Sequence, residues 1–142
     1  MDPSLLELRD RTYATFVEVA RAPKAAELGD EDDVKAGWRQ LHELHALVLD
    51  PVTDEIRMAA PFSAVPTPYR VLARQRWWYA NCAWDAFGIP AALGVDGRVE
   101  SSCPDCDELY AIEVRGAALD RTDLLFHCLV TAENWWDDIV FT

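Results

Sequence analysis

A cysteine and an aspartate stand three residues apart, as Cys82 and Asp85, where the pattern predicts the start of a short helix. Asn81 is a good N-cap residue, so Cys82 would be the first residue of that helix. A cysteine there feels the positive end of the helix dipole, which lowers its pKa and favours the thiolate, the form that binds soft metals. Since Asp85 lies over the same face, the motif predicts a nucleophilic sulfur beside a proton carrier. The alternative interpretation is a buried structural cysteine with an aspartate on the helix surface.

A second pair of thiols, Cys103 and Cys106, forms a Cys-x-x-Cys motif. Such a pair can hold half of a zinc site, act as a redox dithiol or trap a soft metal ion, and a dithiol at a hairpin tip without a chemical role is the remaining interpretation. Zinc at Cys103/Cys106 has little support because a tetrahedral site needs two more ligands. His127 and Cys128 are adjacent on a predicted strand, so their side chains would point to opposite faces of it.

Other familiar catalytic or binding motifs are missing from the sequence. It contains no glycine-rich phosphate loop, no Gly-x-Ser-x-Gly elbow and no His-Glu-x-x-His zinc motif. His42 and His45 stand three residues apart in a predicted helix, and we interpret them as surface residues of that helix. The chemistry of the chain is therefore expected to depend on its cysteines.

Composition and charge exclude several classes of protein. The 142 residues carry a net charge of −12, which argues against a nucleic-acid partner because phosphates would be repelled. The 51 % of hydrophobic residues is enough for a packed core, yet no run resembles a signal peptide or a membrane span. We therefore expect a cytoplasmic protein without a membrane partner. Its four cysteines are then expected to be reduced and available for metal or catalysis.

The first part of the chain predicts helices followed by a hairpin. Apolar residues recur at helical spacing over residues 4–22 and again over 30–46. The turn-forming run Asp50–Asp54 separates two short apolar segments, which is typical of a hairpin. Together these elements predict a winged-helix-like unit over residues 1–60.

A stretch with three prolines, residues 61–68, is expected to join this unit to a second one, because it cannot form a helix interior or a central strand. Short apolar runs then predict strands at 69–72, 77–79, 109–114 and 124–130, with a further candidate at 135–141. We expect a helix at 82–87, closed by Gly88 and Pro90, and a hairpin at Asp96-Gly97. The fold class is therefore α+β, with a small mixed or antiparallel sheet and short helices over residues 61–142.

From Pro61 to the C-terminus, the chain resembles the organomercurial (alkylmercury) lyase family. The segments that carry the resemblance are Pro61-Phe62-Ser63, Asn81-Cys82-Ala83-Trp84-Asp85-Ala86, Ile89-Pro90-Ala91, Leu93-Gly94, Val99-Glu100-Ser101-Ser102-Cys103-Pro104-Asp105-Cys106 and Trp135-Trp136-Asp137-Asp138-Ile139. The N-terminal helices and hairpin are similar to the winged-helix-like front portion of the family. The resemblance implies that residues 61–142 form a lyase-like, β-rich catalytic core.

The resemblance also implies a reaction, the protonolysis of a carbon–mercury bond. By resemblance, Cys82 is the thiol that takes the mercury of R–Hg⁺, and Asp85 passes a proton to the leaving carbon. No cofactor is required; mercury(II) is part of the substrate and then the product ion, and small-molecule thiols are the expected partners. Mercury is soft and prefers sulfur ligands, which extends the usual rule for soft metals.

In the family, a second reactive cysteine lies where this chain ends, so we expect it immediately after Thr142 and expect the core to be incomplete there. Cys128 and the Cys103/Cys106 pair are the candidate substitutes. The alternative function is a non-catalytic module that binds or senses soft metals with its thiols and keeps the lyase fold. A winged-helix DNA regulator is disfavoured because the helix that would read DNA begins with the acidic run Asp30–Asp33.

Overall fold

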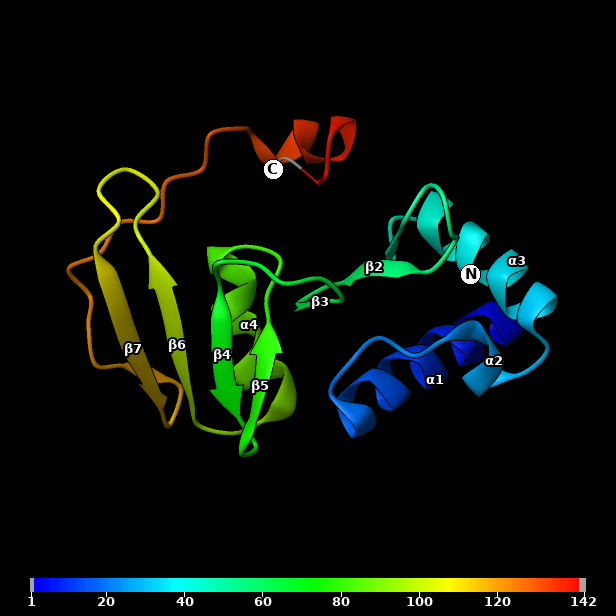
Figure 1. The fold of residues 1–142 in the computed structure, drawn as a ribbon, viewed down its shortest axis with the longest axis horizontal. Coiled ribbons are helices and arrows are strands. Elements are labelled where there is room, and N and C mark those ends of the chain that lie inside the picture. Colours follow the sequence, from blue (N-terminus) through cyan, green and yellow to red (C-terminus); the bar gives the residue numbers. More distant parts are fainter. Residues whose placement is uncertain (1, 141–142) are drawn as a thin grey trace.

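A computed structural model describes residues 2–140 and has an α+β fold. Figure 1 shows three helices and a small sheet on one side of the molecule, and a larger sheet with one helix on the other. Both sheets are antiparallel, with strand orders β1-β2-β3 and β5-β4-β6-β7-β8. The predicted fold class is confirmed. No helix within residues 2–140 is long and apolar enough to span a membrane.

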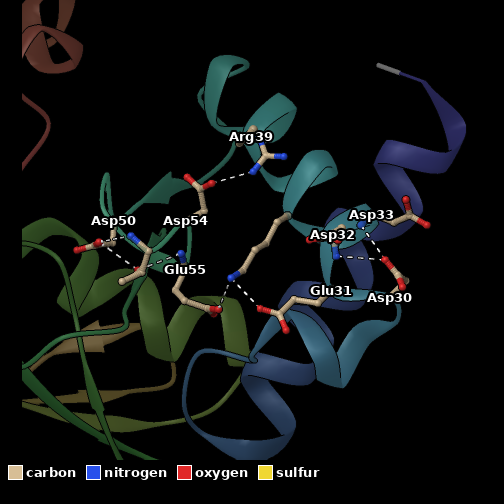
Figure 2. A network of polar contacts seen from close by, with 10 residues as sticks. Asp30, Glu31, Asp32, Asp33, Arg39, Asp50, Asp54 and Glu55 are labelled. Atoms are coloured by element: carbon tan, nitrogen blue, oxygen red, sulfur yellow. Dashed lines mark hydrogen bonds and ion pairs between the residues drawn. The ribbon is translucent and has the colours of Figure 1, made fainter.

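The helices on the first side are α1 (Pro3–Val19), α2 (Ala25–Leu28) and α3 (Glu31–Glu43). The predicted helices at 4–22 and 30–46 are confirmed, but each ends earlier than predicted. Helix α1 stops because Ala20 adopts a left-handed conformation with φ of 57°. Helix α3 begins at Asp30, whose carboxylate accepts the backbone N–H groups of Asp32 and Asp33 at 3.2 Å (Figure 2). The acidic run is therefore a helix cap.

A three-stranded sheet follows, built from β1 (Val48–Leu49), β2 (Ile56–Ala59) and β3 (Phe62–Ser63). The predicted hairpin is confirmed, and Asp50 closes its turn by accepting the N–H groups of Val52 and Thr53. Figure 2 shows the ion pairs that join this hairpin to α3, Arg39–Asp54 at 2.7 Å and Lys35–Glu55 at 3.4 Å. Such exposed pairs contribute little to stability, so apolar packing holds the unit together. Its likeness to a winged helix stays a prediction.

The five-stranded sheet contains β4 (Arg70–Ala73), β5 (Arg76–Tyr79), β6 (Gly97–Ser102), β7 (Leu109–Arg115) and β8 (Ala118–Leu119). The predicted strands at 69–72, 77–79 and 109–114 are confirmed within a residue or two. Strands β4 and β5 are joined by a tight turn in which Arg74 and Gln75 both have positive φ, as a two-residue hairpin of the right twist requires.

Helix α4 (Ala83–Leu93) packs on β4 and β6 through its buried residues Ala86, Ile89 and Leu93. One apolar cluster extends from α1 to β7 and includes residues of both sheets. Phe62 links its two sides, since its ring lies 5.2 Å from those of both Phe16 in α1 and Trp78 in β5. The division at residues 60/61 therefore falls within a continuous core, and it stays a prediction.

The predicted end of the fourth helix is wrong. We expected Gly88 and Pro90 to close it, but α4 runs on to Leu93 and ends at Gly94, which has φ of 63°. Pro90 lies in the last part of the helix and its ring is fully buried. Burial of that ring offsets the hydrogen bond that proline cannot make, so the helix continues through it.

The hairpin predicted at Asp96-Gly97 is also wrong. Gly97 is the first residue of β6, where it pairs with Ala73 of β4 and Val114 of β7. A Cβ at this position would lie 2.8 Å from Cγ of Pro90, so glycine is needed for the close approach of helix and sheet. Gly97 therefore allows α4 to pack closely on β6, and the Asp-Gly pair does not form a hairpin turn.

The strand predicted at 124–130 is wrong as well, because that segment is an extended arm outside both sheets. Strand β8 already occupies the edge of the sheet beside β7, and most side chains of the arm are exposed. Where the 135–141 strand was predicted, a 3₁₀ helix (Ala132–Asp137) forms instead; residues 141 and 142 lie outside the described residues. The arm returns to the N-terminal side, where Trp136 stacks on His45 at 3.9 Å. His45 lies beyond the end of α3, not on its surface as predicted.

Candidate active site

The segment that leads into α4 is held at the start of β4. The backbone N–H of Ala80 donates to the carbonyl of Tyr69 at 3.0 Å, which extends the pairing of β5 with β4 by one step. The hydroxyl of Thr67 donates to the carbonyl of Ala80 at 2.6 Å. Ala80 is fully buried, and the next two residues are Asn81 and Cys82. The end of β5 therefore fixes the position of the segment that leads into Cys82, the candidate nucleophile.

Cys82 is itself the N-cap of α4, so the prediction that Asn81 caps the helix is wrong. Its backbone is extended, with φ of −146°, and its Sγ accepts the backbone N–H of Asp85 at 3.5 Å. The amide of Asn81 makes a different contact, since its Nδ2 donates to Oδ2 of Asp85 at 2.9 Å. The Cys82 sulfur caps the helix, because the Asn81 side chain is hydrogen-bonded to the Asp85 carboxylate instead.

The thiol and the carboxylate lie together, as their spacing predicts. The Asp85 N–H donates to the Cys82 sulfur at 3.5 Å, and the charge of the Asp85 carboxylate raises the pKa of the thiol. Both side chains are half-buried. The carboxylate is therefore near enough to the sulfur to affect its ionisation.

The predicted lowering of the Cys82 pKa is wrong. Burial raises the pKa of the Cys82 thiol, and the negative charge of Asp85 raises it further, against the opposing hydrogen bond from the Asp85 N–H. A helix of 11 residues offers only its first N–H groups to the sulfur, whereas desolvation acts on the whole thiolate. Free Cys82 is therefore held mainly as the thiol at neutral pH.

Burial also raises the pKa of Asp85, while the hydrogen bonds from Asn81 and Cys82 lower it in part. The Asp85 carboxylate therefore takes up a proton more readily in this site than it would in bulk water. Together, the two residues form a weakly acidic thiol beside a carboxylate of raised basicity.

Two tyrosines lie close enough to this pair to interact with it electrostatically. The charge of Cys82 raises the pKa of Tyr69, and the charge of Asp85 raises the pKa of Tyr13, each after the larger effect of burial. Tyr13 comes from α1 and donates its hydroxyl to the carbonyl of Ala46 at 3.0 Å. Neither tyrosine belongs to a sequence motif, so sequence analysis missed both.

The remaining cysteines lie in two places. Cys128 is exposed on the C-terminal arm, and its charge acts on Cys82 and helps to raise the Cys82 pKa. The same arm approaches the start of α4 where the rings of Phe126 and Trp84 lie 6.4 Å apart. Cys103 and Cys106 lie in the turn between β6 and β7. Within the described part of the chain, no group of three or more His, Cys, Asp or Glu side chains could hold a metal ion.

Two cavities, of about 500 and 510 Å³, open beside α1. Tyr13 and Ala60 line both of them, and the second also reaches Pro61 and Phe62. Neither includes Cys82 or Asp85 among its described lining residues. Tyr13 lines both cavities, and the charge of Asp85 acts on its hydroxyl.

The family model described as alkylmercury lyase matches residues 62–142, which include Cys82, Asp85 and the other three cysteines. The chain belongs to the alkylmercury lyase family. The fold agrees with a solved structure described as the mercury-bound form of MerB2, with a TM-score of 0.67 at 17 % sequence identity. That match covers 87 % of this chain and 61 % of the other, so this chain spans less than two thirds of the MerB2 length. No protein with a curated description matches the chain.

Within this lyase-family chain, the structure brings together one predicted pair and adds Asn81 and Tyr69 to it. Cys82 and Asp85 are in contact, Asn81 donates to the Asp85 carboxylate, and Tyr69 comes from the segment before β4. A local signal for Asn81 existed, because it precedes the thiol, but it pointed to a capping role. The catalytic and metal-binding roles of the four cysteines and Asp85 stay predictions.

Proposed function

We propose that this protein cleaves the carbon–mercury bond of organomercurials by protonolysis, with Cys82 as the mercury-binding thiol and Asp85 as the proton shuttle. The observation that carries the proposal is the contact between the Cys82 sulfur and Asp85 at the start of α4, in a chain of the alkylmercury lyase family. Soft mercury prefers sulfur, and the adjacent carboxylate supplies the acid that the leaving carbon needs.

The first step is capture of the organomercurial, which arrives as R–Hg–SR′ on a small thiol. The Cys82 sulfur forms a bond to mercury, the small thiolate R′S⁻ leaves, and the proton of Cys82 moves to the Asp85 carboxylate. This transfer needs a carboxylate of raised basicity close to the thiol; the raised pKa of Asp85 and the 3.5 Å contact of its N–H with the Cys82 sulfur support it. The step therefore ends with Asp85 protonated beside the bound R–Hg group.

The second step breaks the carbon–mercury bond. A second thiolate binds the mercury and pushes electron density onto the carbon, which takes the proton from Asp85 and leaves as R–H. Mercury(II) stays bridged between Cys82 and the second sulfur, and Asp85 is again a carboxylate. Asn81 keeps that carboxylate in place through its 2.9 Å hydrogen bond during both proton transfers. Small thiols then remove the mercury by exchange.

Among the cysteines of the described residues, we assign the role of the second thiolate to Cys128. Its charge acts on Cys82, and its arm contacts the start of α4 through Phe126 and Trp84. Because Cys128 is exposed, an external thiol can also reach the same position. A Cys128→Ser variant should therefore keep its activity only when small thiol is abundant, and lose it at thiol concentrations that sustain the wild type.

The test is release of benzene from phenylmercury in the presence of excess small thiol, measured by gas chromatography. The wild type should release benzene, whereas Cys82→Ser should release none above the protein-free rate. Asp85→Asn should still bind phenylmercury but release benzene about 10² to 10⁴ times more slowly, the usual contribution of a general acid. Asp32→Asn, an exposed aspartate on α3, is the matched control and should behave as the wild type.

The competing hypothesis is a module that binds or senses soft metals without turnover. It predicts that the wild type retains phenylmercury or Hg²⁺ and that no benzene forms. Release of no benzene by the wild type, with phenylmercury bound at Cys82 by mass spectrometry, would therefore refute the lyase proposal and support the binding module.

A further inference from the structure

The turn between β6 and β7, residues 103–108, carries two cysteines outside the Cys82 site. The N–H of Cys103 donates to the carbonyl of Glu108 at 2.9 Å, and the N–H of Asp107 donates to the carbonyl of Cys103 at 2.9 Å. Asp107 has φ of 57°, so the chain reverses sharply just after Cys106. These bonds close the turn into a fixed loop with both cysteines on it.

The sulfur of Cys103 is the focus of this loop. The neighbouring backbone N–H groups of Asp105 and Cys106, with smaller effects from the Cys106 thiol and the Tyr110 hydroxyl, lower the pKa of Cys103. Cys103 is half-buried and Cys106 is exposed, so a solute can reach both sulfurs. The loop therefore presents two accessible thiols, of which Cys103 is the more acidic.

The loop also lies at the same end of the sheet as the Cys82 site. Figure 1 shows the β6–β7 turn at the edge where β4 begins and β5 ends. Ser101 pairs with Tyr110 across β6 and β7. The charge of Tyr69 acts on Tyr110, and Tyr69 in turn feels the charge of Cys82. The two sites therefore share one end of the five-stranded sheet.

We propose that Cys103 and Cys106 form a second, two-sulfur binding site for Hg²⁺, which takes up the ion after it leaves Cys82. The transfer role rests on the proposed lyase function, whereas binding itself does not. The ion arrives as Hg(SR)₂ on two small thiols; each cysteine sulfur forms a bond to mercury, and each departing thiolate takes the proton of the cysteine that replaces it. No oxidant or reductant is needed.

The choice of ion follows from the number of ligands. Zinc would need four ligands, and no third His, Cys, Asp or Glu joins the two cysteines among residues 2–140. Mercury(II) is satisfied by two thiolates, and its softness favours them over any oxygen or nitrogen ligand nearby. Two sulfurs on one loop also bind it as a chelate, so they can compete with separate small thiols.

The experiment uses the full chain with only the two proposed ligands left as cysteines. Reduced, oxygen-free Cys82→Ser/Cys128→Ser protein is given HgCl₂ with an excess of a monothiol, desalted, and analysed by native mass spectrometry. We expect one mercury per chain. Adding either Cys103→Ser or Cys106→Ser to this background should weaken mercury retention about 100-fold or more, because each removes the chelate. Circular dichroism checks that each variant folds.

Three results would overturn the proposal: no mercury retained by the two-cysteine protein, the same retention after either further substitution, or one mercury shared by two chains. Benzene release from phenylmercury by the wild type is measured separately and does not depend on this background. Failure of mercury binding at the loop, with benzene still released, rejects the second site alone. Binding at the loop without benzene release rejects the lyase function and the transfer role, and leaves the binding site standing.

Discussion

Replacing Asp85 by asparagine should make Cys82 more reactive toward a simple alkylating agent while it slows lyase chemistry. The reason lies in the electrostatics of the pair, because the Asp85 charge raises the pKa of Cys82. Asparagine removes that charge but keeps the backbone N–H that donates to the sulfur at 3.5 Å. Asp85→Asn should therefore lower the pKa of Cys82 and increase its thiolate fraction at neutral pH.

The size of the effect follows from Coulomb's law. Two unit charges about 4 Å apart interact by about 1 kcal/mol in water and about 4 kcal/mol at an effective dielectric constant of ~20. Since Cys82 is only half-buried, we take the lower value, which corresponds to about five times more thiolate. A less basic thiolate is also a weaker nucleophile, with a Brønsted slope of about 0.4–0.5, so the net gain in alkylation rate is about two- to threefold.

The assay is the rate of iodoacetamide modification of Cys82 at pH 7.5, followed by peptide mass spectrometry so that the other three cysteines do not interfere. Asp32→Asn removes an exposed carboxylate on α3 and should leave the rate unchanged. An Asp85→Asn protein that is folded by circular dichroism, yet alkylated at Cys82 at the wild-type rate or more slowly, would refute the electrostatic coupling. It would also remove the physical basis for proton transfer between the two residues.

Four further outcomes are expected. Asn81→Ala removes a hydrogen bond that lowers the pKa of Asp85, so the acid limb of the benzene-release profile should move to higher pH; an unchanged limb would exclude Asn81 as a positioning residue. Burial raises the pKa of Asp85, so its protonated form favours folding and this contribution is lost as pH rises through that pKa. Asp85→Asn should therefore raise the Tm at pH 7 and leave the Tm unchanged at a pH below the ordinary carboxyl pKa. A lower Tm at pH 7 would contradict this reasoning. Thr12→Val leaves the buried indole N–H of Trp38 unpaired, which should cost about 1–3 kcal/mol in urea unfolding, whereas Thr12→Ser should cost less; equal losses would show that the hydroxyl is unimportant. Phe62→Ala should cost about 3–5 kcal/mol of unfolding free energy, because its ring joins the two sides of the core, and a loss below 1 kcal/mol would contradict that role.

Local patterns predicted much of the fold. The apolar spacing of α1 and α3 and the turn residues Asp50–Asp54 act over a few neighbouring residues, so they can be read without knowledge of the rest of the chain. The contact between Cys82 and Asp85 belongs to the same class, because residues three apart at a helix start are neighbours whatever surrounds them.

Predictions failed where a distant segment decides the outcome. Pro90 stays inside α4 because the core buries its ring, and Gly97 enters β6 because that ring lies against it. The apolar run at 124–130 has the composition of a strand, but β8 takes the sheet edge beside β7. Each of these signals is locally correct, and tertiary packing overrides it.

The amino-acid order alone predicted Cys82 and Asp85 as the reactive pair and located the Cys-x-x-Cys motif, since chemical type and short spacing are properties of the chain itself. Tertiary structure decided how these groups ionise. Burial reverses the expected shift of the Cys82 pKa, and the Asn81 amide, which was expected to cap the helix, holds Asp85 instead. It also decided which groups surround the pair, because Tyr13 and Tyr69 come from other elements. Desolvation and charge–charge interactions depend on everything within several ångströms, and only the folded chain sets those neighbours.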